Sequence, residues 1–391
     1  MDFQFSPEDQ AFRRELIEFI KQELPPNWEG GGRYPEEDDW DFAVQIRKKM
    51  AGKGWLTMHW PEEYGGQNAS AIRSTIFSEE LTYHRTPGRD IFGVRMLGPT
   101  LMIHGSEEQK RIHLPPVARG EIQWCQGYSE PEAGSDLASL ATKAVLDGDE
   151  YVVNGSKIWT SMAQYADWIM LLTRTDPAAP RHRGITFMLV DMKTPGIEVR
   201  PIINMAGRHE FNEVLFNDVR VPRGNVVGEE NKGWYVAVTL LDFERSGIDY
   251  SATGRRLLDE IKVYAADTIR NGQPLIKLPW VRSLLADRYM ECEVARLMAY
   301  KVAYMQQQGL VPTKEASMSK VFGSEAAQRA SNAALEILGL YGGLAREEKW
   351  AALKGRVQEI WMCAFAGTVA AGTSEIQRNI IAGRGLSLPR G

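Results

Sequence analysis

The feature that most constrains the fold is a change of pattern along the chain. Between about residues 122 and 230, short runs rich in β-branched and aromatic residues follow one another, separated by turn residues. Five runs carry this pattern: DEYVVNGSKIWTS, DWIMLLTRT, GITFMLVDM, GIEVRPI and NEVLFNDVRVP. Short strands bounded by turn residues indicate an all-β module. Inside the first run, Asn154-Gly155 is typical of a two-residue hairpin turn, so we expect the chain to reverse there.

The segment before this module has a helical pattern. Ser6 is followed by Pro7 and two acidic residues, which is a helix start signal with proline at the first helical position. Apolar residues then recur at helical spacing: Phe12, Leu16, Phe19 and Ile20. Helical pattern continues to about residue 120, so we expect a helical domain over residues 1–121.

The pattern becomes helical again from Gly233 onward. WYVAVTLLDFERSGIDYSATGRRLLDEIKVYAAD predicts one long amphipathic helix, and EASMSKVFGSEAAQRASNAALEILGLYGG predicts another that ends at glycines. The 391 residues are enough for two or three domains. We therefore predict an α+β fold with a helical domain at 1–121, a β domain at 122–230 and a second helical domain at 231–391.

Composition excludes several classes of protein. The net charge of −5 gives no sign of a nucleic-acid-binding surface. The three cysteines are scattered and the six histidines show no metal-ligand spacing, which argues against a disulfide framework or a metal site and for a reducing compartment. The N-terminus has no apolar signal-peptide core, and no window of 18 apolar residues occurs. We therefore expect a cytoplasmic protein that does not span a membrane.

Two stretches of the β module have the composition of a binding site. YSEPEAGSDLASL, from Tyr128 to Leu140, offers hydroxyls and backbone N–H groups to a polar ring edge or a phosphate, although an ordinary polar loop has the same composition. SKIWTS places Trp159 two residues before Ser161, so on a strand both side chains point to the same side. An aromatic wall beside a hydroxyl suits a flat heterocycle, and the alternative is a core tryptophan.

One carboxylate stands out in the last third of the chain. Glu244 lies in LLDFERSG, within a helical segment that is otherwise rich in apolar residues. A solvated surface charge paired with Arg245 is the alternative to a catalytic role.

Taken in order, five stretches resemble the acyl-CoA dehydrogenase family of flavoenzymes. They are YSEPEAGSD, NGSKIWTS, VRVPRGNVVGEENKGW, LEILG followed by GG, and GTSEIQR, and they extend over essentially the whole chain. The resemblance implies an N-terminal helical domain, a central β-barrel-like domain and a C-terminal four-helix bundle. It also implies FAD held between the β domain and the bundle, with a neighbouring subunit reaching it in a dimer of dimers.

The resemblance also assigns roles to individual residues. The loop Gln126–Ser129 resembles the wall along the flavin pyrimidine edge, Trp159 the aromatic on the flavin face away from substrate, and Ser161 the hydroxyl that bonds flavin N5. Ser135 resembles a contact to the CoA thioester arm. Within the loop 126–129 the cofactor positions are Gln126, Tyr128 and Ser129. The other FAD-binding positions are Arg270, Glu336, Gly339, Leu340, Gly372, Thr373 and Glu375. Arg270 resembles the start of the segment that reaches the FAD diphosphate of a neighbouring subunit. There the family's Arg-x-x-Phe-Gly has become Arg-Asn-Gly-Gln-Pro, a departure that puts that contact in doubt.

The family's chemistry requires a base for the α-proton, a hydride acceptor at flavin N5 and donors for the thioester oxygen. The base is normally a carboxylate just before Gly-Thr, but this chain has Ala371 there, which keeps only the backbone N–H donor. Some branched-chain and long-chain members carry the base in a pattern like Asp-x-Glu-Arg on the first long helix of the bundle. Asp242, Glu244 and Arg245 match that pattern, so the resemblance predicts Glu244 as the base.

The same substitution bears on the substrate and the partners. A site that replaces a glutamate by Ala371 gains room near the α and β carbons, which favours branched or cyclic acyl groups. The stretches GTSEIQRNIIAGRGLSLPR, LDFERSG and GYSEPEAGSDLASL resemble bacterial members acting on steroid side chains or other bulky acyl-CoAs. Family habit implies an electron-transfer flavoprotein as acceptor and a homotetramer or a heterotetramer with a related subunit. The alternatives are a non-catalytic subunit, a related oxidase or monooxygenase, and a flavin-free scaffold.

Overall fold

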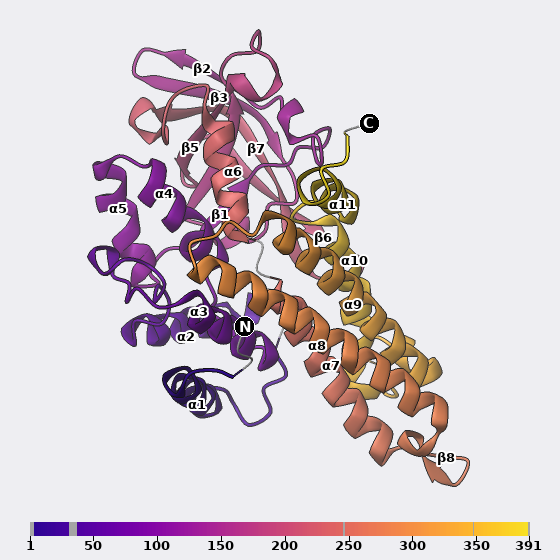
Figure 1. Ribbon diagram of the computed structural model, residues 1–391. Helices are drawn as coiled ribbons and strands as arrows, with labels where there is room; N and C mark the ends of the chain where they lie inside the picture. The colour runs from indigo at the N-terminus through magenta and orange to yellow at the C-terminus, as the bar shows by residue number, and fades with distance from the viewer. Residues whose placement is uncertain (1–3, 31–36, 245–246, 347, 390–391) are drawn as a thin grey trace. The chain divides into compact units, whose positions relative to one another are not determined.

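The computed structural model describes residues 4–30, 37–244, 247–346 and 348–389, apart from the side chains of residues 37 and 240–244. Its elements follow the predicted order of helices, strands and helices (Figure 1). The helices before the strands are α1 (Pro7–Glu23), α2 (Trp40–Gly52), α3 (Ala71–Tyr83), α4 (Gly98–His104) and α5 (Glu107–Ala118), with a π-helical segment, η3 (Ile91–Leu97), before α4. The strands are β1 (Trp124–Gly127), β2 (Lys143–Asp147), β3 (Glu150–Lys157), β4 (Trp168–Arg174), β5 (Ile185–Asp191), β6 (Ile197–Ile203) and β7 (His209–Pro222). The later elements are α6 (Gly233–Glu244), α7 (Ile248–Asp267), β8 (Ile269–Arg270), β9 (Gln273–Pro274), α8 (Pro279–Gln307), α9 (Thr313–Leu338), α10 (Arg356–Val369) and α11 (Ser374–Ile380).

Contacts within the chain divide it into two compact units. Residues 33–69 and 87–244 form one, called here the sheet unit, and residues 1–32, 70–86 and 245–391 form the other, the bundle unit. Helices α1 and α3 therefore pack with the C-terminal helices, while α6 packs with the strands. The predicted domain boundaries 1–121, 122–230 and 231–391 follow the sequence order and stay a prediction.

The sheet unit is built on seven strands among the described residues. Their order is β1-β4-β2-β3-β7-β6, with β5 pairing to the other side of β4. Strands β4 and β5 are antiparallel and almost wholly buried. Alternate residues enter different cores: Met170 and Phe187 pack with the helical residues, whereas Ile169 and Met188 pack with β3 and β7. Burial on both faces explains why DWIMLLTRT and GITFMLVDM are continuous apolar runs.

The hairpin is not at Asn154-Gly155, and that expectation was wrong. The chain reverses between Asp147 and Glu150, which are paired across β2 and β3, with Gly148 in the left-handed region at φ 65°. Asn154 and Gly155 lie inside β3, where the register against β7 shifts. A Cβ on Gly155 would lie 2.7 Å from Cα of Thr142, so glycine is needed there for a close approach at a bulge rather than for a turn.

The bundle unit centres on α9, which packs against α7, α8, α10 and α11 (Figure 1). Its core includes Leu257, Leu258, Ile261, Ile337 and Leu338. The expected single long helix is instead two, because α6 ends at Glu244 and α7 begins at Ile248. Gly247 precedes α7 with φ 74°, and a Cβ there would lie 2.5 Å from the Ser319 hydroxyl oxygen. The sequence did not predict this break, because apolar residues recur at helical spacing on both sides of Gly247.

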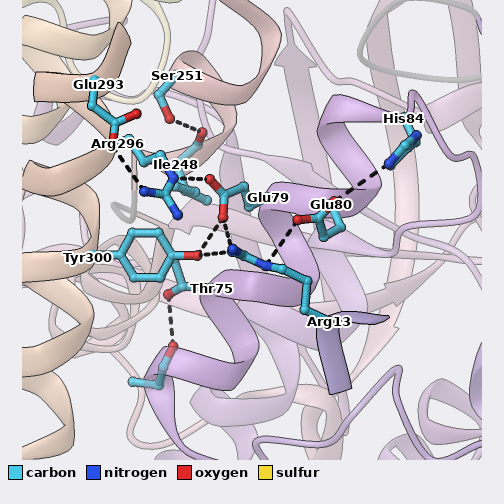
Figure 2. Close-up of polar contacts among 11 residues, drawn as sticks. Arg13, Thr75, Glu79, Glu80, His84, Ile248, Ser251, Glu293, Arg296 and Tyr300 are labelled. Atoms are coloured by element: carbon cyan, nitrogen blue, oxygen red, sulfur yellow. Dashed lines mark hydrogen bonds and ion pairs between the residues drawn. The ribbon is translucent and has the colours of Figure 1, made fainter. Parts of the chain in front are cut away.

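Charged groups join α1 and α3 to α8 within the bundle unit. The carboxylate of Glu79 on α3 pairs with Arg13 and Arg296 and accepts a hydrogen bond from the hydroxyl of Tyr300 at 2.6 Å (Figure 2). Arg13 also pairs with Glu80 at 3.1 Å. The predicted start of α1 is confirmed: Ser6 accepts a hydrogen bond from the backbone of Asp9, and Pro7 is the first helical residue. None of the described helices combines the length and the apolar character needed to cross a lipid bilayer.

Candidate functional site

Two of the predicted cofactor segments lie side by side in the sheet unit. The Gln126–Ser129 segment covers the end of β1 and the residues just after it, and Trp159–Ser161 follows β3. The backbone N–H of Ile158 donates to the carbonyl of Ser129 at 2.9 Å. The ammonium group of Lys157 donates to the carbonyl of Tyr128 at 3.1 Å. These two bonds bring the predicted polar edge and the predicted aromatic wall together.

A buried ion pair supports this junction. Lys157 has no exposed side-chain surface, and its Nζ lies 2.7 Å from Oε1 of Glu130. Glu130 also accepts the backbone N–H groups of Ala141 and Thr142, so one carboxylate ties together the loop from Tyr128 to Thr142. Burial lowers the pKa of Lys157 to about 8, although the charge of Glu130 opposes that shift. Burial alone would raise the pKa of Glu130, but Lys157 and the donated hydrogen bonds hold it below its ordinary value.

Trp159 is exposed by a strained turn rather than by a strand. Strand β3 ends at Lys157, and Trp159 has φ 59° while Met162 has φ 66°. The argument that Trp159 and Ser161 share one side of a strand was therefore wrong, since the backbone no longer alternates there. The indole is 57% exposed and meets the ring of Phe211 edge-on, with centroids 6.0 Å apart. A large aromatic face is thus exposed, and a core tryptophan is excluded.

The polar groups next to Trp159 are compatible with a flavin. The side-chain nitrogen of Gln126 is buried and has no hydrogen-bond partner among the described residues, and the same holds for the hydroxyl of the fully buried Thr160. Buried donors without acceptors are rare in native structures and are explained when a ligand supplies the acceptor. Ser161 is half-buried in the turn, whereas Ser135 is exposed in the loop before β2. The residues present fit a flat ring with a polar edge.

In the bundle unit, the Ala371-Gly372 turn is fixed through its carbonyl oxygens. Ala371 has φ 55° and Gly372 has φ 81°, both left-handed. The buried amide of Gln377 donates to the carbonyl of Ala371 at 3.0 Å, and the buried ammonium group of Lys320 donates to the carbonyl of Gly372 at 2.8 Å. The backbone at Ala371 therefore has a defined shape although its side chain is a methyl group.

Helix α11 begins directly after this turn and borders an open groove. Thr373 caps the helix by accepting the backbone N–H of Ile376 at 3.2 Å. A backbone N–H and the Thr373 hydroxyl lower the pKa of the exposed Glu375. The groove has a volume of about 460 Å³, and the hydroxyl of Ser374 beside it is buried without a partner among the described residues. Its lining includes Thr373, Glu375, Glu325, Gln328 and Arg329.

The end of α9 brings two further predicted residues together. Gly339 ends the helix with φ 64° and ψ −141°, a conformation essentially restricted to glycine. A Cβ at this position would lie 3.7 Å from the guanidinium group of Arg270, which projects from the small β8–β9 hairpin. Glu336 and Leu340 are exposed here, and Leu340 is 94% exposed. A cation beside a bare backbone suits a phosphate group, even though the residues after Arg270 depart from the family pattern.

The predicted base lies at the end of α6. The backbone of Asp242 and Glu244 forms the last turn of this helix, which packs against β5 in the sheet unit. The side chains of Asp242 and Glu244, and the whole of Arg245, lie outside the described residues.

Sequence reasoning missed the residues that support these turns: Glu130, Lys157, Asn212, Lys320 and Gln377. A signal for two of them existed. Lys157 follows Tyr151 and Val153 on the buried alternating face of β3, and Asn212 precedes Val214 and Phe216 on that of β7. A polar residue at an apolar position of a strand needs a buried partner.

The chain is similar along its whole length to known flavoenzymes. Models of the acyl-CoA dehydrogenase N-terminal, middle and C-terminal domains match residues 6–121, 125–219 and 231–386. Acyl-CoA dehydrogenase FadE26 of Mycobacterium tuberculosis is 37% identical, with 100% of this chain and 99% of that protein covered. A chain of the ChsE4–ChsE5 complex from the same organism matches with a TM-score of 0.90 at 37% identity. A chain of the Tcur3481–Tcur3483 steroid ACAD matches with a TM-score of 0.89 at 34% identity. In each comparison 100% of this chain and 100% of the other chain are covered.

Proposed function

The chain belongs to the acyl-CoA dehydrogenase family, and from that premise we propose that it oxidises a bulky acyl-CoA to the trans-2-enoyl-CoA with Glu244 as the base. Membership makes it a flavin-dependent oxidoreductase acting on an acyl-CoA thioester. The identity of the base, of the flavin as FAD and of the acyl group are the proposed steps.

The observation that carries the proposal is the Ala371-Gly372 turn. Its left-handed backbone is fixed by Gln377 and Lys320, so the residue before Gly-Thr keeps its N–H donor, yet it has no carboxylate. A preorganised N–H stabilises the negative charge that develops on the thioester oxygen when the α-proton leaves. The base must then come from another element of the chain.

We place that base on Glu244. It ends α6 in the sequence Asp242-Phe243-Glu244-Arg245, which matches the arrangement found in family members whose base is on a helix. The Glu244 carboxylate takes the α-proton, and the β-hydrogen leaves with its electron pair as a double bond forms between the two carbons. Bound FAD supplies the acceptor for that hydride at N5. Arg245, the next residue in sequence, is the proposed cation that keeps the Glu244 carboxylate ionised until substrate binds.

The other residues hold the cofactor and the thioester. We assign Gln126, Tyr128 and Ser129 to the flavin ring edge, Trp159 to the flavin face and Ser161 to flavin N5. The hydrogen bond from Ile158 to Ser129 supports this assignment, because it joins the loop 126–129 to the turn 159–161. Arg270 is assigned to the FAD diphosphate of a neighbouring subunit. The remaining FAD-binding segments are assigned to Glu336, Gly339, Leu340, Gly372, Thr373 and Glu375. Ser135, Asp242 and Arg245 are assigned to the substrate, with Ala371 leaving room near its α and β carbons.

The similar structures support a proposal for the acyl group of the substrate and for the subunit assembly. Two of the similar structures are a steroid ACAD and a complex of two different chains, so we propose a steroid side-chain or similarly branched acyl-CoA and a related subunit as partner. An electron-transfer flavoprotein in the cytoplasm is the proposed acceptor. The second candidate function is the non-catalytic chain of such a pair, which those two-chain complexes also favour.

Anaerobic bleaching of the flavin absorbance tests the proposal. Wild type, Glu244→Gln and the control Glu229→Gln are each mixed with straight, branched and cyclic acyl-CoAs, alone and with a co-expressed related subunit. Glu229 is exposed and pairs with Lys232 just before α6, so its substitution changes charge without touching the proposed site. We expect wild type and Glu229→Gln to bleach, fastest with branched or cyclic substrates, and Glu244→Gln to be slower by about 10²–10⁴-fold while retaining flavin.

Three results would contradict this scheme. Equal bleaching by Glu244→Gln means that the base lies elsewhere. A flavin-loaded wild type that never bleaches, even with the partner subunit, favours the non-catalytic chain. Rapid oxygen consumption by the reduced enzyme would instead identify an oxidase.

A further inference from the structure

Thr160, the residue between Trp159 and Ser161, is bonded to a single residue of β7 in three ways. Its N–H donates to the carbonyl of Asn212 at 2.9 Å, and the N–H of Asn212 donates back to the carbonyl of Thr160 at 3.1 Å. The side-chain amide of Asn212 donates to that same carbonyl at 3.0 Å. The peptide units on both sides of Thr160 are therefore fixed to Asn212.

The side chain of Asn212 is fully buried and its amide is fully used. Its nitrogen also donates to Oε1 of Gln164 at 2.7 Å, and its oxygen lies 2.7 Å from Nε2 of His209, which donates in the matching tautomer. Gln164 in turn donates to the carbonyl of His209. This arrangement needs two N–H donors on the residue at 212, so aspartate cannot replace asparagine without facing two acceptor oxygens.

The turn needs such support because its backbone is unfavourable on its own. Trp159 and Met162 flank Thr160 and Ser161, and both are bulky residues in the left-handed region. Strained residues persist only where the surrounding structure determines their conformation. Most of the Trp159 ring is exposed, so packing on Phe211 supplies only part of that support, and the bonds to Asn212 supply the rest.

We propose that Asn212 is a positioning residue for the flavin, one that sets the Trp159–Ser161 turn in its binding shape without touching the cofactor. The inference rests on the proposed function, since it takes Trp159 and Ser161 as flavin contacts. It adds a residue on another strand, with the requirement that its side chain be an amide.

The test compares Asn212→Asp with Asn225→Asp in the full-length protein. Asn225 is the matched control, because it too donates its amide to a backbone carbonyl in the sheet unit, that of Leu189 at 2.8 Å. FAD affinity is measured by reconstituting the flavin-free protein, together with the visible flavin spectrum and the hydrogen exchange rate of the Thr160 amide. We expect Asn212→Asp to bind FAD about tenfold or more weakly, with a changed spectrum and faster exchange at Thr160. Asn225→Asp should lose stability but keep wild-type affinity and spectrum.

The proposal is overturned if Asn212→Asp keeps wild-type affinity and spectrum, or if both variants change them equally. Gln164→Ala is a milder second variant should Asn212→Asp fail to fold. It removes one partner of the Asn212 amide, so Thr160 exchange should still become faster, and unchanged exchange overturns the proposal. A wild type that takes up no FAD would defeat the proposed function instead. Thr160 exchange in the flavin-free proteins would still test the role of Asn212.

Discussion

Among the strained turns of the described residues, two carry predicted site residues, one in each unit, and they present different groups. In the sheet unit, Trp159 lies in the left-handed region and presents a large side chain. In the bundle unit, Ala371 lies in the same region and carries only a methyl group. Both turns are fixed by buried side chains that donate to backbone carbonyls, from Asn212 in the first and from Gln377 and Lys320 in the second.

In the proposed function, a different part of each turn meets the ligand. At Trp159 the strained backbone serves to direct a ring outward, so the residue type matters more than the strain. At Ala371 the ordered group is the backbone itself, which is what an oxyanion donor requires. A buried ion pair of Glu130 with Lys157 lies beside the first turn, whereas at the second turn the buried Lys320 donates to a backbone carbonyl. This contrast can be tested by substitutions in each unit.

The largest expected effect comes from removing one partner of the buried pair. Glu130→Ala leaves the Lys157 charge unpaired in the core and releases the N–H groups of Ala141 and Thr142. We expect the free energy of unfolding, measured by urea denaturation at pH 7, to fall by about 3–5 kcal/mol.

The exposed pair of Asp147 with Arg220 provides the control, since both side chains are more than half exposed. Asp147→Ala should cost only a small fraction of the Glu130→Ala effect. Equal losses in the two variants would mean that the buried pair has no special part in supporting the sheet-unit turn.

A smaller, pH-dependent effect is expected for Glu130→Gln, which keeps the shape of the side chain. The pKa of Glu130 in the folded protein is held below its ordinary value of 4.5, so its stabilising contribution is present above pH 4.5 and is lost as the pH falls through the folded pKa. Lys157 stays charged up to its pKa of about 8. We therefore expect the variant to be less stable by about 2 kcal/mol near pH 6, with the gap closing below pH 4.5.

Urea midpoints of both proteins from pH 7 to pH 3 measure that gap. Glu198→Gln serves as a control, because its exposed pair with Arg200 should give little difference at any pH. A gap for Glu130→Gln that stays constant down to pH 3 would show that the carboxylate charge does not stabilise this loop.

Local patterns in the sequence predicted the helices and strands better than the hydrogen bonds that support the turns between them. The Ser6 cap, the run that became β4 and the helix of EASMSKVF could each be predicted because capping and periodicity are local. Asn154-Gly155 misled because a bulge and a hairpin turn favour the same glycine, and only the pairing of β3 with β7 distinguishes them.

The supports could not be predicted because they join residues distant in sequence. Thr160 meets Asn212, Tyr128 meets Lys157, and Lys320 meets Gly372, in each case across at least 29 positions. Nor does any local pattern indicate the positive φ of Trp159, since bulky residues rarely adopt it and the strand motif continues through it. The motifs predicted which groups meet a ligand, and the tertiary structure determines how those groups are oriented.

The smallest expected effect separates backbone from side chain at Ala371. Ala371→Gly removes the penalty of a Cβ at φ 55°, about 1–2 kcal/mol, and adds the entropy cost of glycine, about 0.5–1 kcal/mol. We therefore expect the free energy of unfolding to rise by about 0.5–1 kcal/mol, and flavin bleaching by acyl-CoA to stay within a few-fold of wild type because the N–H donor remains. Ala366→Gly, on the exposed face of α10, should change stability in the opposite direction by a similar amount. If both glycine variants lose stability equally, the left-handed backbone at Ala371 carries no strain, and the two turns differ more than their φ angles indicate.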